Sequence, residues 1–183
     1  MDTRVAFLNL VVAALIVAGG AGVARADRVD DLLAELQEPD QPMWPRLERQ
    51  LIEEWSRSGS AAADLLLQRG RAAMAVRDWP QAIEHLTALT DHAPEFAEGW
   101  YARSEAFYFS DRPGEALADL RRALELNPRH FQALSGVAVI LEELGEPERA
   151  LAAFRAAGAI HPHQPDIKTA IEDLERQVSG QAL

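Results

Sequence analysis

The sequence of 183 residues contains no cysteine, and its only lysine is Lys168. Without cysteine the chain has no disulfides, no thiolate metal ligands and no thiol nucleophile. It also lacks a glycine-rich phosphate loop, a nucleophile elbow and a metalloprotease motif. We therefore expect a protein that is not an enzyme and has no cofactor and no metal.

Basic residues are outnumbered by acidic ones, 18 to 29, which gives a formal net charge of -11. Such an acidic surface repels nucleic acid and anionic lipid heads, so neither is expected as a partner. Hydrophobic residues make up 48% of the chain and charged residues 26%. This composition, rich in Ala, Leu, Glu and Arg, is typical of a helical globular protein.

The first 26 residues have the three-part layout of a secretory signal peptide. A polar start with one arginine precedes an apolar run over residues 5–18, and Gly19 and Gly20 end its helical tendency. Ala24 and Ala26 then supply the small residues that a signal peptidase reads. We expect export to a bacterial periplasm. The alternative is an uncleaved anchor in the inner membrane, because residues 5–24 are about long enough to span a bilayer.

A period of 34 residues governs the centre of the chain. Pro94, Pro128 and Pro162 are spaced by it, and small and large apolar residues share the register. The small positions are Gly70, Ser104 and Ala138 with Ala82, Ala116 and Ala150, and the large ones are Leu86, Leu120 and Phe154. The pattern predicts helix pairs over 64–76 and 79–91, 98–109 and 113–126, and 132–144 and 147–160. A fixed period of this length indicates an α-solenoid, an all-α fold of tandem antiparallel helix pairs.

This pattern resembles the tetratricopeptide repeat (TPR) family. The resemblance rests on Leu66, Trp100 and Leu134 at the fourth repeat position, together with the small residues and the closing prolines. It implies three repeats over 63–164, namely 63–96, 97–130 and 131–164. A capping helix over 165–178 and a tail over 179–183 follow. Residues 27–60 form either a degenerate further repeat or an unrelated helical hairpin. Arg69 and Arg103 replace the family's usual leucine, which we expect to be a change at an exposed edge.

The resemblance also implies a concave groove lined by the first helix of each pair, where a peptide or protein would bind. The candidate binding residues are Leu67, Arg71, Met74, Tyr101, Glu105, Tyr108, Phe109, Val139 and Glu142. Aromatic side chains suit a peptide site, and the acidic flank favours a partner with a basic segment. Some family members clamp a C-terminal carboxylate with Lys and Asn. Only Arg71 could do so here, which disfavours that mode.

Two functional hypotheses remain open. The first is an exported adaptor or scaffold that binds its partner in the groove, and the second is a structural subunit of an envelope assembly. The one histidine group, His130 with His161 and His163, is expected to be polar turn residues and not a metal site. The oligomeric state stays open.

Overall fold

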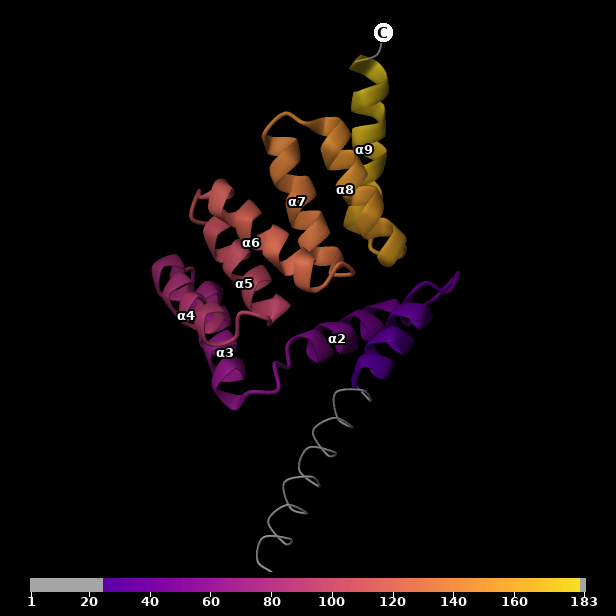
Figure 1. The fold of residues 1–183 in the computed structure, drawn as a ribbon. Coiled ribbons are helices and arrows are strands. Elements are labelled where there is room, and N and C mark those ends of the chain that lie inside the picture. Colours follow the sequence, from indigo (N-terminus) through magenta and orange to yellow (C-terminus); the bar gives the residue numbers. More distant parts are fainter. Residues whose placement is uncertain (1–24, 182–183) are drawn as a thin grey trace, which may run out of the picture. The chain divides into compact units, whose positions relative to one another are not determined.

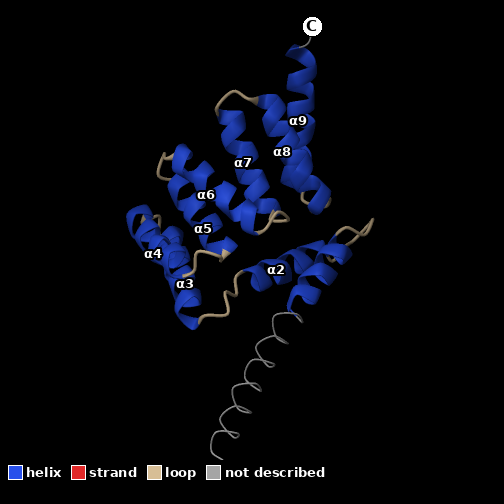
Figure 2. Cartoon of the chain, in the orientation of Figure 1, coloured by secondary structure: helices blue, strands red, loops and turns tan. Residues whose placement is uncertain are grey.

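The computed structural model describes residues 25–181, and they divide into two compact units, one ending at Glu54 and one beginning at Trp55. Helices joined by short turns make up both, and no strand occurs in the described residues (Figure 2). The predicted all-α fold class is confirmed. Within 25–181, no helix has the length and apolarity needed to cross a membrane. The predicted signal peptide lies almost entirely outside the described residues.

The first unit contains a helix over 25–36 and most of α2 (Trp44–Trp55). Leu32, Leu33 and Leu36 are buried on the first helix, and Leu47 and Leu51 are buried on α2. These leucines recur at helical spacing, as expected for the buried stripe of an amphipathic helix.

Seven helices form the second unit and follow one another along the array from α3 to α9 (Figure 1). Their bounds are α3 (Ala61–Ala75), α4 (Trp79–His92), α5 (Ala97–Tyr108), α6 (Pro113–Leu126), α7 (Phe131–Glu143), α8 (Pro147–Ile160) and α9 (Pro165–Gln181). The helix pairs α3–α4, α5–α6 and α7–α8 correspond to the predicted pairs. The last helix, α9, packs against α8.

Prolines mark both kinds of helix boundary. Pro113 and Pro147 begin α6 and α8, where the missing N–H would have no partner inside the helix. Pro94, Pro128 and Pro162 follow the C-caps of α4, α6 and α8, because the residue before a proline disfavours the helical conformation. The positions predicted for these prolines are confirmed.

Small residues let the two helices of a pair approach each other. Ala82, Ala116 and Ala150 have no exposed surface. A Cβ added at Gly70 would lie 2.5 Å from Cγ of Leu86, so only glycine fits beneath that leucine. The sequence predicted Ala82 as the partner of Gly70, whereas this close contact is with Leu86.

The first helices of successive pairs lie on the inner side of the array. α3 packs directly on α5 as well as on α4, whereas α4 and α6 do not pack closely on each other. In a curved repeat array the closer row of helices faces the concave side. The surface of α3, α5 and α7 is therefore the predicted groove, which we call the inner surface. The side formed by α4, α6 and α8 is the outer surface.

Candidate peptide-binding surface

A polar cluster links the first two helices of the inner row to the start of the third. Glu98, on α5, is 1% exposed and forms an ion pair with Arg71 of α3. Its other oxygen lies 3.0 Å from Nε2 of His130, the N-cap of α7. Because Nδ1 of His130 accepts the backbone N–H of Ala133, Nε2 carries the hydrogen and donates it to Glu98. The cluster thus gives one buried carboxylate two donors.

The His130 ring lies between two aromatic rings. Trp55 stacks on it with ring centroids 4.8 Å apart, and Tyr101 packs at 4.5 Å. Trp55 also contacts Phe131 at 5.7 Å, and the neighbouring Ser56 hydroxyl accepts a hydrogen bond from Arg71. His130 lies in the turn between α6 and α7, as expected, but this polar side chain is not in contact with solvent. It is fully buried, and its capping and aromatic contacts explain why.

Glu105 is a half-buried carboxylate of this surface, and it has no basic partner in the described ion pairs. Burial raises its pKa to about 7, and repulsion from Glu98 adds to the rise. The Tyr101 hydroxyl, which donates to Glu105 at 3.1 Å, and the charge of Arg71 act in the opposite direction. Burial, with the nearby charge of Glu105, raises the pKa of Tyr101 above its ordinary value. A cation placed beside Glu105 would favour its ionised form and lower its pKa.

Toward the other end of α5, Tyr108 connects two repeats. Its hydroxyl donates to Glu143 of α7 at 2.5 Å, and this hydrogen bond raises the pKa of Tyr108 to about 12. Phe109, the C-cap of α5, is 57% exposed and stacks on Trp79 at 5.3 Å. The aromatic side chains at this end of α5 thus remain partly accessible.

The other predicted residues divide by burial. Leu67 is 2% exposed and belongs to the hydrophobic core, so its side chain contributes little to a binding surface. Met74 and Val139 are half-buried, and Glu142 is exposed. Arg71 is already engaged by Glu98 and Ser56. The accessible surface is therefore formed by Met74, Glu105, Tyr108, Phe109, Val139, Glu142 and Glu143.

Arg103 of α5 points toward α4 and α6, in an environment that was not predicted from the sequence. Arg103 is only 14% exposed, and it forms a two-pronged ion pair with Asp119 at 2.7 and 2.9 Å. It also donates to Thr90 and lies over the Trp100 ring. The expectation of an exposed-edge substitution is therefore wrong for Arg103, whereas Arg69 is exposed as expected. An arginine with an aspartate on the facing helix 16 residues later was the available signal.

Comparison with known proteins agrees with this fold. The tetratricopeptide repeat family matches residues 67–111 and 106–165. A TPR repeat-containing protein of Rhizobium etli is 29% identical over 154 residues, which cover 84% of this chain and 76% of the relative.

Solved structures are similar as well. The Sgt2 TPR domain from Aspergillus fumigatus superposes with a TM-score of 0.63 at 21% identity, covering 67% of this chain and 83% of that one. The TPR2B domain in the pHsp70 complex of yeast Sti1 gives a TM-score of 0.60 at 25% identity, covering 64% of this chain and 99% of that one. The family match spans more than half of the sequence, and the chain therefore belongs to the tetratricopeptide repeat family.

Proposed function

We propose that this protein is an exported adaptor that binds a basic segment of a partner protein on its inner surface, between the second and third repeats. The observation that carries the proposal is Glu105, a half-buried carboxylate without a basic partner in the described ion pairs. It lies on the same helix as the accessible Tyr108 and Phe109. A lysine or arginine of the partner would supply the missing charge.

The surrounding residues suit such a segment. Tyr108 and Phe109 offer aromatic contact area at low entropic cost, and Val139 adds an apolar contact. Glu142 and Glu143 extend the acidic character along α7, which favours encounter with a cationic peptide. The yeast Sti1 domain, whose structure is a complex with pHsp70, supports a peptide or protein as the ligand class.

Binding without catalysis fits this arrangement. The inner polar cluster satisfies its groups through internal hydrogen bonds, and TPR proteins typically act as adaptors. The N-terminal segment over 1–26 supports export to a bacterial periplasm, with an uncleaved inner-membrane anchor as the alternative. Export would bring the inner surface to envelope proteins.

A direct test uses a fluorescent arginine-containing peptide and fluorescence anisotropy. We expect Glu105→Gln to weaken binding by about tenfold, which corresponds to about 1.4 kcal/mol and lies between the values for an exposed and a fully buried charge pair. Tyr108→Ala should weaken it by a similar factor. At Tyr101 the variant to use is Tyr101→Phe, which removes only the hydroxyl that donates to Glu105. Tyr101→Ala would also remove the ring packed on His130 and so destabilise the fold.

A matched control makes the test specific. Glu148→Gln removes an exposed carboxylate from the first turn of α8. This variant should leave peptide affinity nearly unchanged. Equal affinity of wild type, Glu105→Gln and Tyr108→Ala, with unchanged circular dichroism, would reject the inner surface as the binding site.

A further inference from the structure

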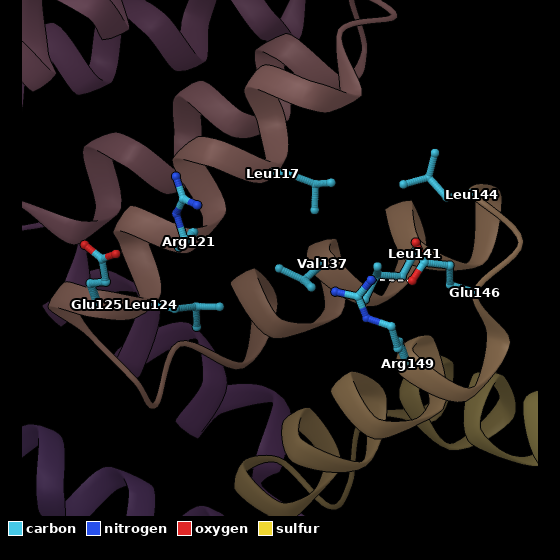
Figure 3. Close-up of a pocket in the computed structure, with 9 residues that line it drawn as sticks. All are labelled: Leu117, Arg121, Leu124, Glu125, Val137, Leu141, Leu144, Glu146 and Arg149. Carbon is cyan, nitrogen blue, oxygen red and sulfur yellow. Dashed lines mark hydrogen bonds and ion pairs between the residues drawn. The ribbon is translucent and has the colours of Figure 1, made fainter.

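A second concave region lies on the outer surface, between α6, α7 and the start of α8 (Figure 3). It has a volume of about 620 Å³ and is open to solvent. Its apolar lining consists of Leu117, Leu124, Val137, Leu141 and Leu144. Leu117, Leu124 and Val137 point into the space between the helices (Figure 3). We call this region the outer groove.

The equivalent position between the first two repeats shows what can fill such a groove. Moving back 34 residues from Val137 leads to Arg103, whose guanidinium occupies that junction. Arg103 is held there by Asp119, Thr87 and Thr90, and it lies 5.5 Å from the centre of the Phe107 ring. The first junction is therefore closed by a side chain of the protein itself.

Each of these residues is replaced at the second junction. Val137 stands in place of Arg103, and Ala153 stands in place of Asp119. Arg121 and Leu124 take the places of Thr87 and Thr90. A valine is too short to fill the position of an arginine. The groove is consequently open, and its lining is apolar where the first junction is polar.

The charges at the rim indicate the chemistry of an occupant. Glu125 pairs with Arg122, and Glu146 pairs with Arg149, as the dashed line in Figure 3 shows for the latter pair. Arg121 takes part in none of the ion pairs of the described residues. The groove thus presents an apolar floor beside one guanidinium that lacks a counterion.

We propose that the outer groove is a second docking site, which binds an amphipathic segment of a partner protein that carries leucine-like side chains and one carboxylate. The aliphatic side chains would cover Leu117, Val137 and Leu141, and the carboxylate would pair with Arg121. The first junction is filled by a cationic side chain, Arg103, that faces an aspartate. The outer groove instead offers an apolar lining and a cationic rim, so its occupant should be apolar with one acidic group. The site shares no residue with the inner surface and does not depend on its function.

The test uses the full chain and a short fluorescent helical peptide with leucines along one face and one glutamate beside them. Peptides with glutamine or lysine in place of that glutamate complete the series. We expect affinity to fall in the order Glu, Gln, Lys, with about a fivefold change for the exposed ion pair. Arg121→Glu should reverse the order. Chemical shifts of the Leu117, Val137 and Leu141 methyl groups should move on binding.

Refilling the groove provides the sharpest variant. Val137→Arg with Ala153→Asp rebuilds the closed first junction at the second one, and it should abolish binding while circular dichroism stays unchanged. Val76→Arg places the same side chain at the exposed C-cap of α3, far along the chain from the outer groove, and should leave this binding intact. If the double variant does not fold, Arg121→Glu alone still tests the proposal, because it should reverse the order of affinity for the Glu, Gln and Lys peptides.

Three results would overturn the proposal. One is equal affinity for the Glu and Lys peptides. Another is binding that survives in a folded Val137→Arg/Ala153→Asp variant. The third is concentration-dependent self-association, seen by analytical ultracentrifugation, that shifts the same methyl groups, because the groove would then bind a second copy of this chain.

Discussion

The two junctions between the three repeats follow one sequence period but differ in how they use charge. At the first junction, Arg71 pairs with Glu98 on the inner side and Arg103 pairs with Asp119 on the outer side. At the second, Glu105 on the inner side and Arg121 on the outer side have no ion-pair partner among the described residues. The charges of the first junction are paired within the protein, and we propose that those of the second serve partner binding.

The largest effect should come from exposing a third junction, the one that α9 covers. Ile167 and Leu174 of α9 are buried, and Ile171 reaches Gly158 of α8. Deleting residues 165–183 exposes this apolar face, so the unfolding temperature should fall by about 10 °C or more, or the protein should aggregate. Unchanged thermal unfolding of the truncated protein would show that α9 does not cap the array.

The closed junction can be opened by Arg103→Ala. The variant leaves Asp119 buried without its partner, and we expect a loss of about 3–5 kcal/mol of unfolding free energy in urea. Arg69→Ala, at the same repeat position but exposed, should change it by less than about 0.5 kcal/mol. Arg103→Val with Asp119→Ala copies the second junction and should recover much of the loss. Equal effects of Arg103→Ala and Arg69→Ala would mean that the ion pair does not close the junction.

Glu105 makes stability depend on pH at the open junction. Its pKa is about 7 in the folded protein and near 4.5 in the unfolded chain, so the folded state binds more protons between these values. Unfolding free energy should therefore decrease as the pH rises from about 4.5 to 7 and then level off. Glu105→Gln should raise stability above pH 7 by on the order of 3 kcal/mol and flatten this dependence. If unfolding free energy depends on pH in the same way in wild type and in Glu105→Gln, the raised pKa of Glu105 is wrong.

The smallest effect concerns a feature that the repeats share. Ala116 and Ala150 occupy equivalent fully buried positions, so Ala116→Leu and Ala150→Leu should each cost about 1–3 kcal/mol through overpacking. Similar losses in denaturant titrations would show that the junctions differ in their charged residues and not in their helix crossings. A much smaller cost at Ala116 would instead indicate that loose packing extends into the second repeat.

The helix pairs were predictable from sequence because prolines and small residues determine helix ends and close packing locally, within their own helix pair. Proline spacing gave the helix boundaries to within a few residues, and the small residues gave the crossings. Residues that act through distant partners were not predictable. His130 depends on Glu98 and Trp55, and Arg103 depends on Asp119, so their burial appears only once the repeats are stacked.

The inner surface was predictable only in part. The resemblance identified the first helices of the pairs as its lining, but periodicity alone does not tell which side chains remain accessible. Leu67 shares the repeat position of Tyr101 and is nevertheless part of the core. Only the contacts show that Arg71 is already paired while Glu105 is not.

The most direct measurement is a chemical-shift map of the isotope-labelled protein titrated with the arginine-containing peptide. We expect the perturbed backbone amides to concentrate at residues 105–109 and 139–143, with little change in α3 and α4. This result would place the ligand at the second junction. Perturbations centred on Arg71 and Glu98, or none at saturating peptide, would contradict the claim that the open junction is the binding surface.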